Sequence, residues 1–248
     1  MEELPDLPLL WNRPKSVAYP NTWHKFQSKS KDGKSFAIKI VDLTPERFEE
    51  SIELMMKYYF PEEPLSVSSK LLEDELSMQI YQYVISKMLE NSVSILAVLD
   101  EDVPKPEIVG LQILSIASKG DPSLPEVPGE AIQKMSKIYE DIRINTDPFE
   151  ILGTDKYVHD WGLLVIPQYR GLDIGYNILL SLEKLAKAFD IKGSMIMFTR
   201  IQSQILAQRA GFKLYNEIIY DEYKDDQGQV IFPVQGTKSL KFMGIKYE

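Results

Sequence analysis

The sequence contains no cysteine and only two histidines, His24 and His159, among its 248 residues. The absence of cysteine excludes disulfides, thiolate metal ligands and a cysteine nucleophile. Two histidines are too few for a histidine-rich metal site, and they leave few candidates for a Ser-His-Asp triad. We therefore expect no metal.

Long apolar runs and an excess of positive charge are also missing. No apolar run reaches 18 residues, so we expect no transmembrane helix. The first residues, "MEELPDLPLLWNRPK", are acidic and broken by prolines, unlike a signal peptide. The formal charge of −9 disfavours nucleic acid and anionic membranes as partners, because both require a basic surface. We expect a cytoplasmic monomer with a small-molecule ligand, and the acidity suits a cationic one.

Hydrophobic residues, 44% of the chain, suffice for one large core. The periodicity of apolar residues predicts a single α+β domain with a central mixed sheet over residues 36–248, preceded by an irregular arm, 1–35, whose aromatic residues dock on it. Residues 119–129 are expected to form a Pro/Gly loop. Strands are predicted at 35–43, 92–100, 107–118, 161–166, 194–199, 217–223 and 238–246, and helices at 44–60, 70–90, 130–144, 174–189 and 202–210.

The segment "VIPQYRGLDIG" (165–175) joins an apolar strand to an apolar-periodic helix. Gly171 and Gly175 would let the backbone approach a ligand, and the helix would point its N-terminal amides at the same place, which suits a phosphate. The spacing matches neither the dinucleotide fingerprint nor a Walker loop, which disfavours a nicotinamide-dependent enzyme. An ordinary strand-turn-helix connection explains these residues equally well.

The same segment resembles the acyl-CoA pyrophosphate loop of the GNAT N-acetyltransferases, with the pattern Q/R-x-x-G-x-G/A. Gln168, Arg170 and Gly171 fit it, Gly175 fits the glycine or alanine that usually follows, and Asp173 departs from it.

Three ordered blocks are similar to the insect arylalkylamine N-acetyltransferase branch. They are "YYFPEEPLS", "FEILGTDKYVHDWGLLVIPQYRG" and "AGFKLYNEIIYDEY", and the resemblance spans residues 36–248.

This resemblance implies the GNAT fold, in which strand 161–166 splays from strand 194–199 around acetyl-CoA. The chain would then transfer an acetyl group to a primary amine. The acceptor would be an arylalkylamine such as dopamine, serotonin, octopamine or tyramine, or a polyamine or agmatine. A non-catalytic acyl-CoA-binding protein is the alternative. The implied cofactor residues are Leu163, Leu164, Val165, Gln168, Arg170, Gly171, Leu172, Asp173, Ile174 and Gly175.

Glu63 is the candidate general base. The proline at position 64 biases its backbone away from helical geometry. Without the resemblance, a solvated loop acid is the plainer interpretation. "EEPLS" resembles the family's E-P-L-N block, however, and the glutamate of that block is the base. Glu62 is the adjacent competitor, but no proline follows it.

Thr199 and Ser203, counted back from "AGF" at 210–212, fall on the family's two active-site hydroxyl positions. If the helix begins by Thr199, both face one side of it. Ser203 would hydrogen-bond the leaving sulfur, and Thr199 would orient substrate or water. The alternatives are an N-cap for Thr199 and an ordinary polar helix residue for Ser203. His159 is interpreted as a surface histidine, with proton relay as the alternative.

Asp173 places a carboxylate in an anion-binding turn. For a working enzyme we expect its side chain to turn away from the phosphate and either cap free amides of the helix that begins at Ile174 or favour the positive end of that helix. Its amide would still serve the phosphate.

Overall fold

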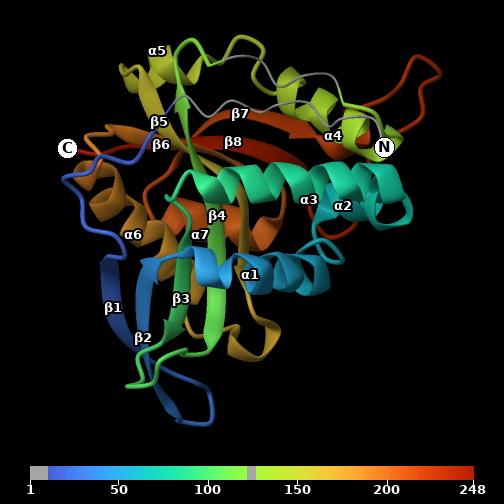
Figure 1. Ribbon diagram of the computed structural model, residues 1–248. Helices are drawn as coiled ribbons and strands as arrows, with labels where there is room; N and C mark the ends of the chain where they lie inside the picture. Colours follow the sequence, from blue (N-terminus) through green and yellow to red (C-terminus); the bar gives the residue numbers. More distant parts are fainter. Residues whose placement is uncertain (1–10, 122–126) are drawn as a thin grey trace.

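The computed structural model describes residues 11–121 and 127–248, in which one eight-stranded sheet carries helices on both faces (Figure 1). Part of the predicted 119–129 loop lies outside the described residues. The strand order is β1-β2-β3-β4-β5-β6-β8-β7, and among these strands only the β5–β6 pair is parallel. The strands are β1 (Thr22–Lys29), β2 (Ser35–Asp42), β3 (Ile95–Leu99), β4 (Ile108–Ser118), β5 (Lys156–Val165), β6 (Gly193–Phe198), β7 (Lys213–Ile219) and β8 (Ser239–Lys246).

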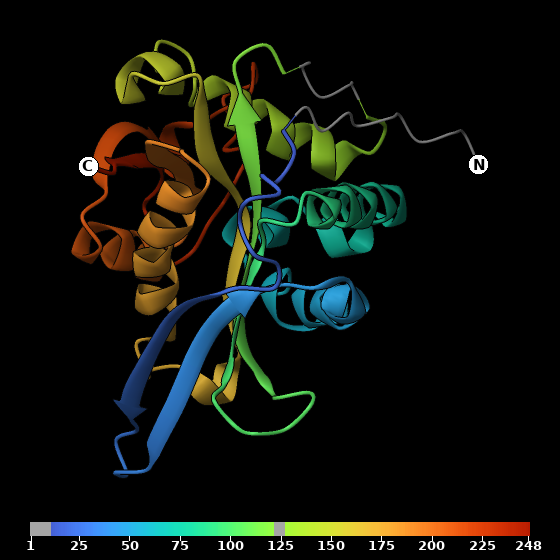
Figure 2. The same cartoon turned by 60° about the vertical axis from the view of Figure 1, so that its left-hand side comes forward.

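Two apolar clusters form the core, one on each face of the sheet. Figure 2 shows α1 and α3 on one side and α6 on the other. Because helices cover both faces, central strand β4 is buried from Ile108 to Ile116 rather than alternating. The helices are α1 (Phe48–Leu54), α2 (Pro64–Ser68), α3 (Glu75–Glu90), α4 (Glu130–Asp141), α5 (Pro148–Leu152), α6 (Ile174–Ala188) and α7 (Ile201–Arg209).

The β5–β6 pair is splayed, as expected. Its register holds a single residue pair, Val158 with Ser194, whereas β5 stays paired with β4 as far as Val165. Beyond Val158 the two parallel strands therefore diverge, and the second half of β5 has backbone groups that β6 does not occupy.

The prediction of an irregular arm is wrong for residues 22–29, which form edge strand β1 and pair antiparallel with β2. The aromatic docking is confirmed, because the rings of Trp11 and Trp23 lie 5.2 and 5.7 Å from that of Phe189. Arg13 and the indole of Trp23 both donate to the buried carboxylate of Asp42, which ties the arm to the end of β2.

Several other predicted elements differ from the structure. The strand expected at 161–166 is β5, which begins earlier at Lys156, and the helix expected at 70–90 begins only at Glu75, after a 3₁₀ turn. The strand expected at 217–223 is β7, which begins at Lys213, and residues Tyr220–Glu222 form a 3₁₀ turn, η5. The turn brings the hydroxyl of Tyr220 within 2.9 Å of the carbonyl of Thr199. The helix expected at 44–60 ends in a π-helical turn, η2 (Met55–Tyr59), which packs against β5.

Candidate active site

Two cavities open beside β5 and meet at its centre. The large cavity, about 660 Å³, lies under α3 and α4, and the turn cavity, about 490 Å³, includes the 165–175 turn. The four residues that line both are Tyr59, Asp160, Met197 and Thr199. A ligand in one cavity can therefore contact a ligand in the other at this junction.

The turn cavity gathers most of the residues predicted as a site. All three predicted catalytic residues line it, as do the predicted cofactor residues other than Gln168 and Leu172. Gln168 is exposed, and Leu172 is buried in the apolar cluster beneath α6. Gln168 therefore lies on the outside of the turn and Leu172 packs the turn against α6, and neither contacts the cavity.

The turn offers free amides to a ligand. Within the described part of the chain, no hydrogen bond is formed by the backbone amides of Gly171, Leu172 and Asp173. They lie at the N-terminus of α6, where the helix dipole is positive. Gly171 has φ +86°, and a Cβ placed there would have no heavy atom within 4 Å, so the space over the turn is open. Unpaired amides around an open space suit a phosphate.

The expected role of Asp173 as a cap of α6 is wrong. Asp173 has the left-handed conformation, φ +53° and ψ 19°, and caps no amide of α6. Its carboxylate instead pairs with Arg209 of α7 at 3.3 Å.

Glu63 caps helix α2. Its backbone is extended, with φ −73° and ψ 124°, as the following proline predicts. The carboxylate is buried and accepts hydrogen bonds from the amide of Leu65 at 3.1 Å and from the amide and hydroxyl of Ser66 at 2.6 and 2.7 Å. The interpretation as a solvated loop acid is therefore wrong.

Glu62 joins two arginines at the edge of the turn cavity. Its carboxylate lies 2.8 Å from Arg200 and 3.0 Å from Arg170. The hydrogen bond from Arg200, supported by that from Arg170, holds the pKa of Glu62 below its usual value. Glu62 is thus engaged as an ion-pair partner, and it places Arg200, to which the sequence assigned no role, beside the predicted phosphate site.

Thr199 and Ser203 both line the turn cavity, although α7 begins only at Ile201. They therefore do not share a helical face, and the N-cap of α7 is Arg200 rather than Thr199. The hydroxyl of Ser203 donates to the carbonyl of Arg200 at 2.8 Å. Thr199 follows β6 directly and reaches the junction of the two cavities.

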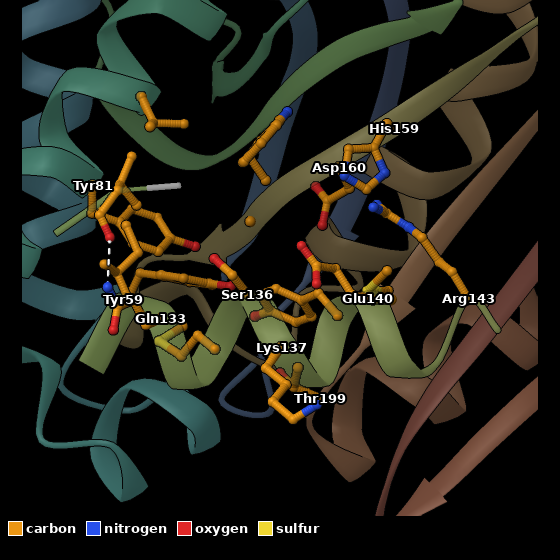
Figure 3. Close-up of a pocket in the computed structure, with 18 residues that line it drawn as sticks. Tyr59, Tyr81, Gln133, Ser136, Lys137, Glu140, Arg143, His159, Asp160 and Thr199 are labelled. Carbon is orange, nitrogen blue, oxygen red and sulfur yellow. Dashed lines mark hydrogen bonds between the residues drawn. The ribbon is translucent and has the colours of Figure 1, made fainter. Parts of the chain in front are cut away.

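The large cavity is lined by aromatic side chains and by charged side chains of α4 and the turn that follows it. Figure 3 shows Glu140 of α4 and Arg143, which follows that helix, on the side toward His159 and Asp160 of β5, whereas Lys137 extends from the other side of α4. The aromatic residues that line it are Tyr59, Tyr81, Tyr139 and Trp161. Such a lining suits a ligand with an apolar body and a polar group.

The prediction of a surface position for His159 is wrong, since this residue lines the large cavity. Burial, with a smaller contribution from the cation of Arg143, lowers the pKa of His159 to about 3. Its imidazole is therefore uncharged at neutral pH. Its Nδ1 lies 3.5 Å from the carbonyl of Met195, and its ring is edge-on to Trp161 at 5.4 Å.

Asp160 was not identified from the sequence. Burial raises the pKa of this carboxyl group to about 7, although a hydrogen bond from the side-chain amide of Gln112, at 2.9 Å, and the amide of Gly162 act in the opposite direction. The available signal was an acid inside the mostly apolar strand "YVHDWGLLV". Strand alternation alone could not say that Asp160 faces a cavity rather than solvent.

A β-bulge positions this acid. Opposite Ile113 and Leu114 of β4 lie Gly162 and Asp160, so Trp161 is the extra residue. Gly162 has φ +146°, and a Cβ there would come within 2.9 Å of the ring of Tyr59. Glycine therefore allows Tyr59 to close over the strand at the junction.

Across residues 11–121 and 127–248, no group of three or more histidine, aspartate or glutamate side chains could hold a metal ion. No helix in these ranges is long and apolar enough to span a bilayer.

No protein-family profile and no curated protein sequence matches the chain. Solved structures do. A protein named arylalkylamine N-acetyltransferase 7 from the mosquito Aedes aegypti is 28% identical, with a TM-score of 0.87 over 96% of this chain and 100% of that one. Arylalkylamine N-acetyltransferase 2 of the same species is 22% identical, with a TM-score of 0.78 over 85% and 99%. A Drosophila melanogaster polyamine N-acetyltransferase is 17% identical, with a TM-score of 0.71 over 84% and 99%.

The neighbours under 25% identity establish the fold, and the mosquito protein at 28% matches nearly the whole chain. Together with the splayed β5–β6 pair and the turn at the start of α6, they show that this chain has the GNAT fold, and the chain is similar to the insect arylalkylamine N-acetyltransferases.

Proposed function

We propose that the chain transfers the acetyl group of acetyl-CoA to the primary amine of a small molecule. The observation that carries this proposal is the pair of cavities that meet at Asp160 and Thr199, one lined by the splayed strand and the phosphate-type turn, the other by aromatic residues. The mosquito relative at 28% identity, which is named an arylalkylamine N-acetyltransferase, supports it.

The residues of the turn cavity fit acetyl-CoA. Backbone groups of Leu163, Leu164 and Val165, which β6 leaves unpaired, would hydrogen-bond the pantetheine arm as an added strand does. The free amides that begin at Gly171 would hold the pyrophosphate, and Arg170 would lie beside it. Bound there, the cofactor supplies an activated thioester as the acetyl donor.

The large cavity would take the acceptor. Its four aromatic side chains favour an arylalkylamine, such as dopamine, serotonin, octopamine or tyramine, over a polyamine or agmatine.

Catalysis would proceed by direct attack of the amine, with Glu63 as a general base on the side of the turn cavity. A carboxylate has about four acceptor positions, and three are used by the amides and hydroxyl of α2, which leaves room for one proton. Ser203 would turn its hydroxyl from the carbonyl of Arg200 to donate to the departing sulfur, and Thr199 would orient the acceptor or a water molecule.

A panel of amines tested with acetyl-CoA, with release of free CoA as the readout, decides the proposal. We expect turnover with at least one arylalkylamine, and an increase in melting temperature with acetyl-CoA but not with NAD, since a ligand of the folded state stabilises it by mass action. Saturable binding of acetyl-CoA without turnover of any amine would favour the alternative, a non-catalytic acyl-CoA-binding protein.

A further inference from the structure

The junction of the two cavities contains one carboxyl group among the described residues. Of the four side chains that line both cavities, two are Tyr59 and Met197, one is Thr199, and the fourth is Asp160. An acceptor nitrogen that approaches a thioester in the turn cavity from the large cavity must pass these side chains. Asp160 is therefore placed to contact that nitrogen.

The structure holds Asp160 firmly. The bulge at Trp161 sets its direction, and the fully buried Gln112 donates to its Oδ1 at 2.9 Å. The backbone amide of Gly162 also acts on this carboxylate. A carboxylate has about four acceptor positions, so these two donors leave acceptor capacity for a donor from the cavities.

Glu63 is arranged differently. Its carboxylate lines the turn cavity but not the large cavity, and its two oxygens cap α2 through Leu65 and Ser66. An amine still held in the large cavity meets Asp160 before it can reach Glu63.

Compared with His159, Tyr59 and Tyr81 around it, Asp160 is the group whose charge changes near neutral pH. Burial raises its pKa to about 7 and lowers that of His159 to about 3, and burial also raises the pKa values of Tyr59 and Tyr81, so these hydroxyls stay neutral. The charged and titratable groups that line the same cavity from α4 and the turn after it are Lys137, Tyr139, Glu140 and Arg143. A base with a pKa near the working pH accepts a proton more effectively than an ordinary aspartate.

We propose that Asp160 binds the ammonium group of the acceptor at the junction and takes its first proton, an inference that rests on the proposed function. The ammonium gives one proton to the carboxylate of Asp160, and the neutral nitrogen attacks the thioester carbon to form the C–N bond. As the C–S bond breaks, the nitrogen loses its second proton to Glu63, from which it passes to the departing thiolate. Asp160 releases the first proton to solvent, so one proton is released per turnover.

The test compares wild type with Asp160→Asn and with the matched exposed control Asp155→Asn. With 2-phenylethylamine at pH 7, Asp160→Asn should lower kcat/KM by roughly 10²–10³-fold, the usual value of a general base, while the control stays within twofold. The increase in melting temperature with acetyl-CoA should be unchanged in both variants. The ammonium group of β,β-difluoro-2-phenylethylamine is much more acidic. With this amine the loss of kcat/KM in Asp160→Asn, relative to wild type, should be at least tenfold smaller, because the acceptor no longer needs the base. A merely structural defect would persist with both amines.

A binding measurement tests the proposal without requiring turnover. In calorimetry with CoA present, wild type should bind 2-phenylethylamine about tenfold more weakly at pH 6 than at pH 8, as a carboxyl group with a pKa near 7 takes up a proton. Asp160→Asn should bind it weakly at both values. If wild type turns over but Asp160→Asn keeps its kcat/KM within threefold, or shows an equal deficit with both amines, Asp160 is not the proton acceptor. If wild type turns over no amine, the proposed function fails, and the calorimetry alone decides whether Asp160 binds an ammonium group.

Discussion

Replacing Asp160 by asparagine should change how stability depends on pH. Burial raises the pKa of this carboxyl group from 3.8 to about 7, so the folded protein keeps a proton that the unfolded chain releases at lower pH. Where only the folded state binds the proton, each pH unit removes about 1.4 kcal/mol of stability. The stability that the bound proton of Asp160 gives the folded state is fully present below about pH 4, and it is lost as the pH rises to about 7.

The magnitude follows from the two pKa values. Integrated from pH 5 to pH 8, the wild-type protein should lose about 2.5 kcal/mol of unfolding free energy relative to Asp160→Asn. Asparagine has nearly the same shape and can accept the bond from Gln112, so the comparison isolates the charge. Groups common to both proteins cancel in the difference.

The assay is urea unfolding of wild type, Asp160→Asn and Asp155→Asn at pH 5, 6, 7 and 8. Asp155 is exposed and directly precedes β5, so its variant should differ from wild type by a constant amount across the range. If the gap between wild type and Asp160→Asn changes by less than about 0.5 kcal/mol, the carboxylate is solvated through the cavity, and our account of its burial is wrong.

Three further changes test other parts of the structure. Glu63→Gln should lower kcat/KM by roughly 10²–10⁴-fold. Because it weakens the cap of α2, it should also cost about 0.5–2 kcal/mol of unfolding free energy in urea. Activity within threefold of wild type would exclude Glu63 as a base. Asp173→Gly should bind CoA about two- to tenfold more tightly by calorimetry, with the gain shrinking in high salt; tenfold weaker binding would mean that the aspartate organises the turn. Arg13→Ala should cost about 3–5 kcal/mol in urea unfolding, because the carboxylate of Asp42 stays buried without its cation; a loss below 1 kcal/mol would show that the arm is dispensable.

The turn at the start of α6 was predictable because its parts are contiguous in sequence. An apolar strand, a proline, glycines and a helix start follow one another, and each has a local signal. The bend at Glu63 was predictable for the same reason, since proline restricts the residue before it. The buried environment of Glu63 was not, because it comes from packing.

Edge strand β1 escaped prediction for a physical reason. A strand at the edge of a sheet needs only a little apolar surface, and along Thr22–Lys29 only Trp23 is buried. The rest of the segment is polar or half-exposed, so its sequence resembles a loop. Its stability comes from pairing with β2, which the sequence of β1 alone does not encode.

The large cavity was the hardest part to predict. Its walls come from η2, α3, α4, β5 and β6, and the charged residues of α4 follow the ordinary pattern of a solvated helix face. Nothing within α4 or the turn after it shows that Arg143 acts on the environment of His159 in β5. Such a site exists only once the sheet has brought these elements together.

Local backbone geometry accounts for the carboxylate in the phosphate turn. Position 173 has φ +53°, a left-handed conformation that aspartate tolerates better than most residues other than glycine. At 4 Å from a phosphate an unpaired carboxylate would cost about 4 kcal/mol at an effective dielectric of 20. Arg209, whose guanidinium also stacks on Tyr176 at 4.5 Å, opposes that cost with a cation 3.3 Å from the carboxylate. Because the amide of Asp173 is unpaired, the residue still offers a donor to the ligand. The departure from the family pattern is therefore compatible with cofactor binding, since the backbone conformation is retained and α7 supplies the compensating charge.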